Sequence, residues 1–168
     1  MAICCDMGII SKKMISPVAN IITEHLHIPG GIGTSFSLMF IVIAAAFLNI
    51  FGSGLLMCFV QSIIAFIIGT SGSMGMLVFV AYLVPGLIID LSILILKHFF
   101  VKLNIIGIAI TNALAGFSAA LCANTLTFQL KGPPLLLYLG VAFTAGMIFG
   151  ALASLLLDRL TPTLTNLK

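Results

Sequence analysis

The chain has 168 residues, of which 61% are hydrophobic and only 7% are charged, and its formal net charge is +3. Soluble globular domains carry about a quarter charged residues, so this composition excludes an ordinary soluble domain and predicts a protein of the lipid bilayer. At about 20 residues per spanning helix, six crossings are the most that this length allows. We therefore expect an all-α integral membrane bundle of about six transmembrane helices, forming a single domain over residues 1–168.

The sequence also argues against nucleic-acid binding and catalysis. Its seven Lys and Arg residues are scattered near segment ends, whereas nucleic-acid-binding proteins gather basic residues on one face, so we expect no nucleic-acid partner. The sequence has no phosphate-binding loop of the Walker type, and no Ser-His-Asp or Cys-His arrangement has supporting spacing. We expect no enzymatic activity and no cofactor, and any ATP hydrolysis would be done by partner subunits.

Turn-forming and charged residues divide the chain into six apolar segments. The first, over residues 3–28, is long enough to cross a bilayer but contains Lys12, Lys13 and Pro17. Because a lysine at the centre of a membrane helix costs about 2.5–3.5 kcal/mol, we predict an irregular or broken helix there. Five further helices are predicted over residues 35–51, 54–69, 75–96, 103–126 and 134–157.

The distribution of positive charge predicts the orientation of these helices. With six crossings, both termini lie on the same side as Arg159 and as the turn that contains Lys97 and Lys102, and Lys131 lies on the other side. Cytoplasmic loops of membrane proteins are enriched in Lys and Arg. We therefore expect a cell-membrane protein, surrounded by lipid, with cytoplasmic N- and C-termini and with the Lys131 loop facing outward.

Polar side chains at membrane depth must face protein, water or a ligand instead of lipid. Tyr82 and Asp90 are eight residues apart and share one helical face, and Pro85 between them kinks the helix. Asp90 could equally well make a structural ion pair or helix-packing hydrogen bond, and Gln61 could equally well make only an interhelical hydrogen bond. The predicted substrate-binding residues are Asn20, Glu24, Gln61, Tyr82 and Asn124.

A structural or coupling role is predicted for Asp90, Asn112, Gly146 and Gly150. The two glycines are four residues apart, a spacing that lets helix backbones approach closely. This pattern predicts tight packing, either within the chain or against a membrane partner.

A metal site is suggested by the sequence E-H-x-H, at Glu24, His25 and His27. That pattern lacks the further ligands needed to complete a coordination sphere. A carboxylate at the mouth of a cavity would equally attract a cationic organic ligand, whose ring Phe36, Phe79 or Tyr82 could contact. We therefore expect an organic ligand and no bound metal.

Residues 15–96 contain the sequences ISPVANIITEHLHIPGG, SFSLMFIVIAA, a glycine-rich loop and YLVPGLIIDL. This half of the chain resembles the substrate-binding S components of energy-coupling factor (ECF) vitamin transporters, in particular the YkoE-like group for thiamine and hydroxymethylpyrimidine. The resemblance implies a six-helix subunit that captures a vitamin from outside and then joins a transmembrane coupling protein and two cytoplasmic ATPases. The small residues that the family often places on its first helix are reduced here to Ala2 and Ala19.

The sequence therefore predicts the substrate-binding membrane subunit of an ECF-type ABC importer for a small, thiamine-like vitamin or precursor. One alternative is a membrane scaffold that does not transport, whose polar side chains would pair fully with one another. Another is a cobalt or nickel uptake component, because LHIPGG is similar to the start of those proteins, although His27 has no free amino terminus beside it. A channel or exporter would need a continuous polar path, and five strongly apolar helices argue against one.

Overall fold

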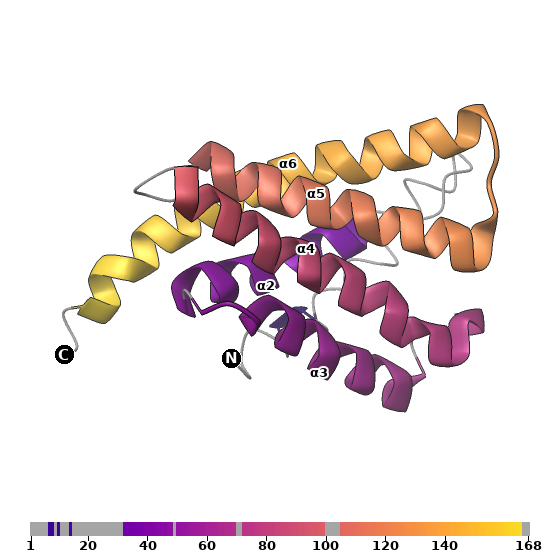
Figure 1. Cartoon of the computed structure of the whole chain (residues 1–168), viewed down its shortest axis with the longest axis horizontal. Helices are drawn as coiled ribbons and strands as arrows, with labels where there is room; N and C mark the ends of the chain where they lie inside the picture. The colour runs from indigo at the N-terminus through magenta and orange to yellow at the C-terminus, as the bar shows by residue number, and fades with distance from the viewer. Residues whose placement is uncertain are drawn as a thin grey trace.

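Helices form every element of the described chain (Figure 1). The computed structural model describes residues 7, 8, 10, 14, 32–48, 50–69, 72–99 and 105–165. The all-α fold class is confirmed for these residues, and the predicted helix over residues 3–28 lies largely outside them. The long helices are α2 (Ile32–Leu48), α3 (Ser53–Ile68), α4 (Val78–Phe99), α5 (Ile105–Ala123) and α6 (Pro133–Thr165). A 3₁₀ helix, η1 (Gly72–Leu77), precedes α4, and a π-helix, η2 (Asn124–Phe128), continues α5.

Three segments of the described chain are long and apolar enough to cross a membrane, namely Gly75–His98, Ile105–Phe128 and Pro133–Arg159. Their 24, 24 and 27 residues extend about 36–40 Å at 1.5 Å per residue, which exceeds the hydrocarbon thickness of about 30 Å. The apolar helices α2 and α3 are shorter, with 17 and 16 residues, and extend only about 24–26 Å.

Two glycines with positive φ lie where the observed helix ends differ from the approximate predicted ones. The predicted helix over residues 35–51 ends earlier, at Leu48, because the chain turns before Gly52, which has a φ of 92° and precedes the first residue of α3. The predicted helix over residues 75–96 begins as α4 only at Val78, because Gly75 has a φ of 51° and a ψ of −128°. Such backbone conformations favour glycine and interrupt an α-helix.

The helices form an antiparallel bundle in which chain neighbours pack on one another. Figure 1 shows α5 and α6 side by side, α4 beside α5, and α3 on the far side of α4. Helix α2 contacts α3, α4, α5 and α6. The C-terminal ends of α4 and α6 therefore lie at one end of the bundle, and the loop that contains Lys131 lies at the other.

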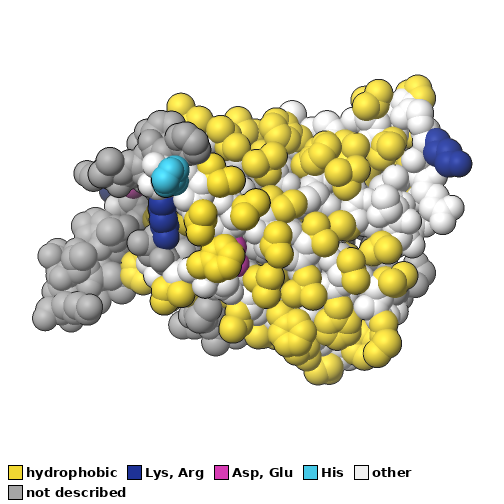
Figure 2. All heavy atoms as spheres, viewed as in Figure 1, with side chains coloured by type: hydrophobic (Ala, Val, Ile, Leu, Met, Phe, Trp, Pro, Cys, Tyr) yellow, Lys and Arg dark blue, Asp and Glu magenta, His cyan; other side chains and the backbone are white. Residues whose placement is uncertain are grey.

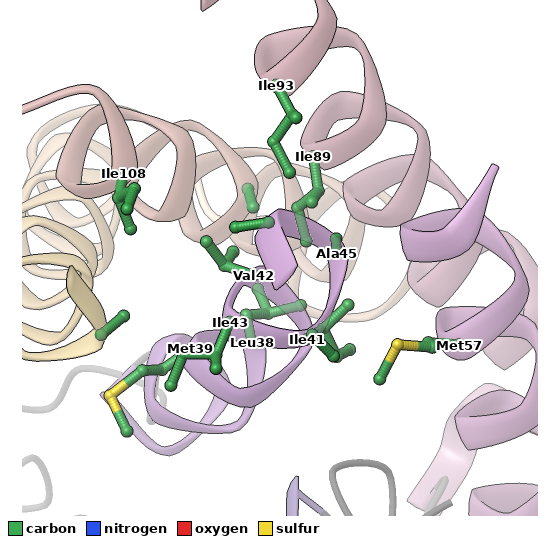
Figure 3. Packing of buried hydrophobic residues seen from close by; sticks show 14 of the residues in the cluster. Leu38, Met39, Ile41, Val42, Ile43, Ala45, Met57, Ile89, Ile93 and Ile108 are labelled. Atoms are coloured by element: carbon green, nitrogen blue, oxygen red, sulfur yellow. The ribbon is translucent and has the colours of Figure 1, made fainter. Parts of the chain in front are cut away.

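The apolar core is centred on α2, whose buried side chains contact α3, α4 and α5. Figure 3 shows Ile41 and Val42 of α2 between Met57 of α3, Ile89 of α4 and Ile108 of α5, and all five side chains are buried. The outer surface is also apolar, because many large hydrophobic side chains of α3, α4 and α6 are exposed. Figure 2 shows hydrophobic side chains over most of one face, with basic side chains at its two ends. Such a surface fits a hydrocarbon environment.

Gly146 and Gly150 lie at the contact between α6 and α5. A Cβ atom at Gly146 would be 2.6 Å from the Cα atom of Ala113, and one at Gly150 would be 2.6 Å from the Cα atom of Ala109. Real Cβ atoms do not approach other atoms so closely, so these two positions require glycine while the helices keep this separation. The glycine pair therefore mediates packing within the chain, one of the two outcomes that the four-residue spacing predicted.

Candidate functional site

A cavity of about 90 Å³ lies inside the bundle, with lining residues on α2, α3, α4, α5 and α6. It brings together two of the predicted substrate-binding residues, Gln61 and Tyr82. Three other polar side chains, those of Thr34, Ser37 and Tyr138, also line it. The remaining lining residues are apolar or small: Leu38, Ala81, Pro85, Gly116, Ala119, Ala120 and Ala123.

Small residues on α5 and a proline on α4 shape the walls of this cavity. Gly116 is a close-contact position, since a Cβ atom there would be 2.8 Å from the Oγ atom of Ser35. Pro85 lies inside α4 and has no N–H group to donate to the carbonyl of Ala81, the residue four positions earlier. Ala81 and Pro85 both line the cavity.

Gln61 is the amide of the cavity and is only 1% exposed. It is held in a narrow space, because a Cβ atom at Gly8 would be 2.5 Å from the Nε2 atom of Gln61 and 3.3 Å from the Oγ atom of Ser37. Gly8 therefore lies beside the same wall. A larger residue at Gly8 would require the end of the Gln61 side chain to move.

The two tyrosines of the cavity come from different helices. Tyr82 on α4 is partly buried against the apolar core. Tyr138 on α6 is almost fully buried, and its ring lies 6.0 Å from that of Phe128 in an edge-to-face arrangement. Aromatic rings held in this way offer a ligand both apolar area and a hydroxyl group.

The described lining suits the uncharged, hydrogen-bonding part of a ligand. Its described polar side chains are one amide and four hydroxyls, with no charged group among them. An amide and hydroxyls can donate and accept hydrogen bonds, whereas an uncompensated ion in such a place would carry a large desolvation cost. The volume of about 90 Å³ is below the 300–1,000 Å³ or so of typical ligand pockets, so a vitamin-sized ligand requires the walls to separate.

Asn124 does not line the cavity, although its neighbour Ala123 does. Its Oδ1 atom accepts a hydrogen bond from the N–H group of Leu130 at 2.8 Å, and its Nδ2 atom donates to the Leu130 carbonyl at 3.4 Å. The Asn124 carbonyl also accepts from the N–H group of Gln129 at 2.7 Å. Asn124 is thus the first residue of η2, where it hydrogen-bonds to backbone groups of the turn that follows η2 and does not line the cavity.

Asp90 caps a neighbouring helix. It is 5% exposed, and its two carboxylate oxygens accept hydrogen bonds from the N–H groups of Gly54 at 2.9 Å and Leu55 at 2.8 Å. These groups lie in the first turn of α3, where backbone N–H groups lack helical partners and the helix dipole favours negative charge. Of the two interpretations left open by the sequence, this geometry favours the structural one, with backbone donors and not a cation as partners.

Asn112 connects three helices at the centre of the bundle. Its side chain is fully buried, and its Nδ2 atom donates to the carbonyls of Gly146 at 2.9 Å and Ser35 at 3.4 Å. The hydroxyl of Ser35 in turn donates to the carbonyl of Ala142 at 3.1 Å. These bonds join α5 to α6 and α2, so the structure gives Asn112 a packing role that agrees with the predicted structural group.

The remaining predicted ligand residues, Asn20 and Glu24, lie outside the described residues, as do His25 and His27. Within the described ranges, no three His, Cys, Asp or Glu side chains lie close enough together to hold a metal ion. Comparisons with protein-family models, curated proteins and solved structures find no match for this chain. The resemblance to ECF S components therefore stays a prediction.

Sequence reasoning missed Gly8, Thr34, Ser37 and Tyr138 as neighbours of the candidate site. Ser and Thr are common within apolar membrane helices, where they bond to their own backbone, so no local signal singled out Thr34 or Ser37. Tyr138 follows a run of leucines at the start of α6. Its position four residues before Ala142, which is buried against α5, is a helical-face signal that could have identified it.

Proposed function

We propose that this chain is the substrate-binding membrane subunit of an ECF-type ABC importer and captures a small heterocyclic nutrient in the cavity around Gln61 and Tyr82. The observation that carries this proposal is a cavity with five hydrogen-bonding side chains inside a bundle whose core and outer surface are apolar. Buried polar groups are costly at membrane depth and usually mark function. A thiamine-like vitamin or pyrimidine precursor is the substrate class that this proposal names.

Capture begins with separation of the cavity walls. Gln61 then hydrogen-bonds to the polar edge of the heterocycle, and the rings of Tyr82 and Tyr138 pack against its faces. The start of α4 is the element best suited to move, because Gly75 interrupts the helix before it and Pro85 kinks it beyond Tyr82. Closure of this segment would bury the nutrient.

The orientation and partners follow from the same proposal. Six crossings would place the C-terminal ends of α4 and α6 in the cytoplasm, and Lys97 and Arg159, at those ends, support this orientation. Lys131, at the opposite end, would be outside. A transmembrane coupling protein and two cytoplasmic ATPases would supply the ATP hydrolysis that drives reorientation and release.

The test is the thermal stability of the detergent-purified chain with a panel of vitamins and precursors. A ligand at a hundredfold its Kd stabilises the folded state by about 2.7 kcal/mol, so thiamine or a pyrimidine precursor should raise the Tm clearly. Gln61→Leu should reduce the rise, because a tenfold higher Kd would lower the stabilisation to about 1.4 kcal/mol. Thr144→Val is the matched control, because Thr144 is exposed and its hydroxyl bonds only within α6. A panel in which no compound raises the Tm would contradict the proposal.

A membrane scaffold is the second candidate, and a specific observation favours it. Both carboxylate oxygens of Asp90 and both side-chain polar atoms of Asn124 bond to backbone groups of the same chain, as a purely structural bundle would require. Such a protein would show no ligand-dependent stabilisation but would retain a membrane partner during purification. The nutrient panel and co-purification therefore separate the two functions.

A further inference from the structure

A second and larger cavity, of about 340 Å³, opens where the α2–α3 turn meets the C-terminal half of α4. It shares no lining residue with the cavity around Gln61. Its volume lies within the range of about 300–1,000 Å³ that is typical of ligand pockets. The residues that give it chemical character are Phe51, Asp90, Ile93, Leu94, Lys97 and His98.

The lining changes from basic to apolar along α4. Lys97 and His98 lie in the last turn of the helix and are exposed, whereas Ile93, one turn earlier, is buried. Asp90 lies about 10 Å from Lys97 along the helix axis, at the inner end, where both of its oxygens already accept backbone hydrogen bonds from α3. A ligand therefore meets two basic side chains first and an apolar wall beyond them.

The position of this cavity matches a bilayer boundary. The candidate span Gly75–His98 ends at the basic pair, and Figure 2 shows basic side chains at the end of the hydrophobic face. Basic residues in the last turn also complement the helix dipole, but that role needs no cavity. Basic pockets between helices at the edge of a membrane bind anionic lipid head groups.

We propose that this cavity binds one anionic phospholipid. Its phosphate lies at Lys97 and His98, and the upper part of an acyl chain lies over Phe51, Ile93 and Leu94. Charge complementarity selects an anionic head group, and the apolar wall directly below the basic pair selects a lipid over a free anion. The proposal does not depend on the nutrient cavity or on its ligand.

The test is native mass spectrometry of the full chain, purified in a neutral detergent without nutrient and mixed with phosphatidylglycerol or phosphatidylcholine. We expect at least fivefold more retained phosphatidylglycerol than phosphatidylcholine. Retention should fall at least fivefold in the double variant K97Q/H98Q. K131Q is the matched control, because it removes one exposed basic residue at the opposite end of the bundle, and its retention should equal that of the unmodified chain.

A second variant tests the apolar wall. Leu94 is half-exposed, so Leu94→Trp should fold, narrow the cavity and reduce retention of phosphatidylglycerol. It also keeps the proposal testable if K97Q/H98Q does not fold. Equal retention of the two lipids, unchanged retention in the basic or Leu94 variants, or loss of bound lipid on addition of inorganic phosphate would each overturn the lipid site.

Discussion

The contact between α5 and α6 allows one substitution to be tested against a matched control in the same helix. Gly146 and Gly140 both lie in α6, but only Gly146 faces α5 closely. A Cβ atom at Gly146 would be 2.6 Å from the Cα atom of Ala113 and 2.9 Å from the carbonyl oxygen of Asn112, whereas at Gly140 no atom lies within 4 Å. Backbone atoms cannot rotate away, so Gly146→Ala must separate the helices.

The expected difference between the two variants is about 1–3 kcal/mol, the usual cost of overpacking. Both substitutions gain the same helix propensity, about 0.8–1.0 kcal/mol for Gly to Ala, and this gain cancels in the comparison. Gly140→Ala should therefore be at least as stable as the unmodified chain, and Gly146→Ala should be less stable than Gly140→Ala. Equilibrium unfolding in mixed detergent micelles measures both. Equal stability of the two variants would refute the close contact.

Four further predictions test individual side chains, three of them by thermal unfolding in detergent. Asp90→Ala should lower the free energy of unfolding by about 1.5–3 kcal/mol, because two backbone N–H groups lose a charged acceptor. The control Asp158→Ala, at an exposed position, should change it by less than about 0.5 kcal/mol. Equal effects of the two substitutions would contradict the capping role of Asp90. Asn112→Ala should destabilise by at least about 0.6 kcal/mol, a typical interhelical hydrogen bond in a membrane, and no loss would exclude its packing role. Gln129→Gly should raise the free energy of unfolding by up to about 1 kcal/mol, because Gln129 has a φ of 50°, a left-handed conformation that glycine adopts more readily. A less stable variant would contradict this expectation. In a titration with a cationic ligand, Glu24→Gln should weaken binding by about tenfold, and unchanged affinity would remove Glu24 from the site.

The apolar segments of the fold could be predicted from sequence because hydrophobic length is set by the bilayer. Within the predicted segment 103–126 the described residues 105–126 belong to α5 and η2, and the predicted segment 134–157 lies within α6. The ends of the helices were less predictable because they depend on backbone geometry. The glycine-rich turns at residues 52–54 and 69–75 were visible in the sequence, but the residue at which each adjoining helix begins or ends depends on backbone φ values that a sequence does not give.

The partners of the polar residues could not be predicted for a different reason. Asp90 bonds to backbone groups 36 and 35 residues away, and backbone donors leave no mark in a sequence. Gln61 and Tyr82 were identifiable as polar groups in apolar helices, but their meeting at one cavity depends on how α3 and α4 are rotated. Asn124 adjoins a residue that lines the cavity, but its side chain hydrogen-bonds to the backbone of Leu130 instead of facing the cavity.

The proposed contact between Gln61 and a bound nutrient can be measured by calorimetric titration. The ligand is the panel compound that raises the Tm most, and the proteins are the unmodified chain, Gln61→Leu and the control Thr144→Val. Loss of a buried hydrogen bond that leaves the ligand's polar group unpaired costs about 1–3 kcal/mol, so Kd should rise about 5- to 160-fold in Gln61→Leu and stay unchanged in Thr144→Val. An unchanged Kd in Gln61→Leu, or no measurable binding to the unmodified chain, would contradict the account.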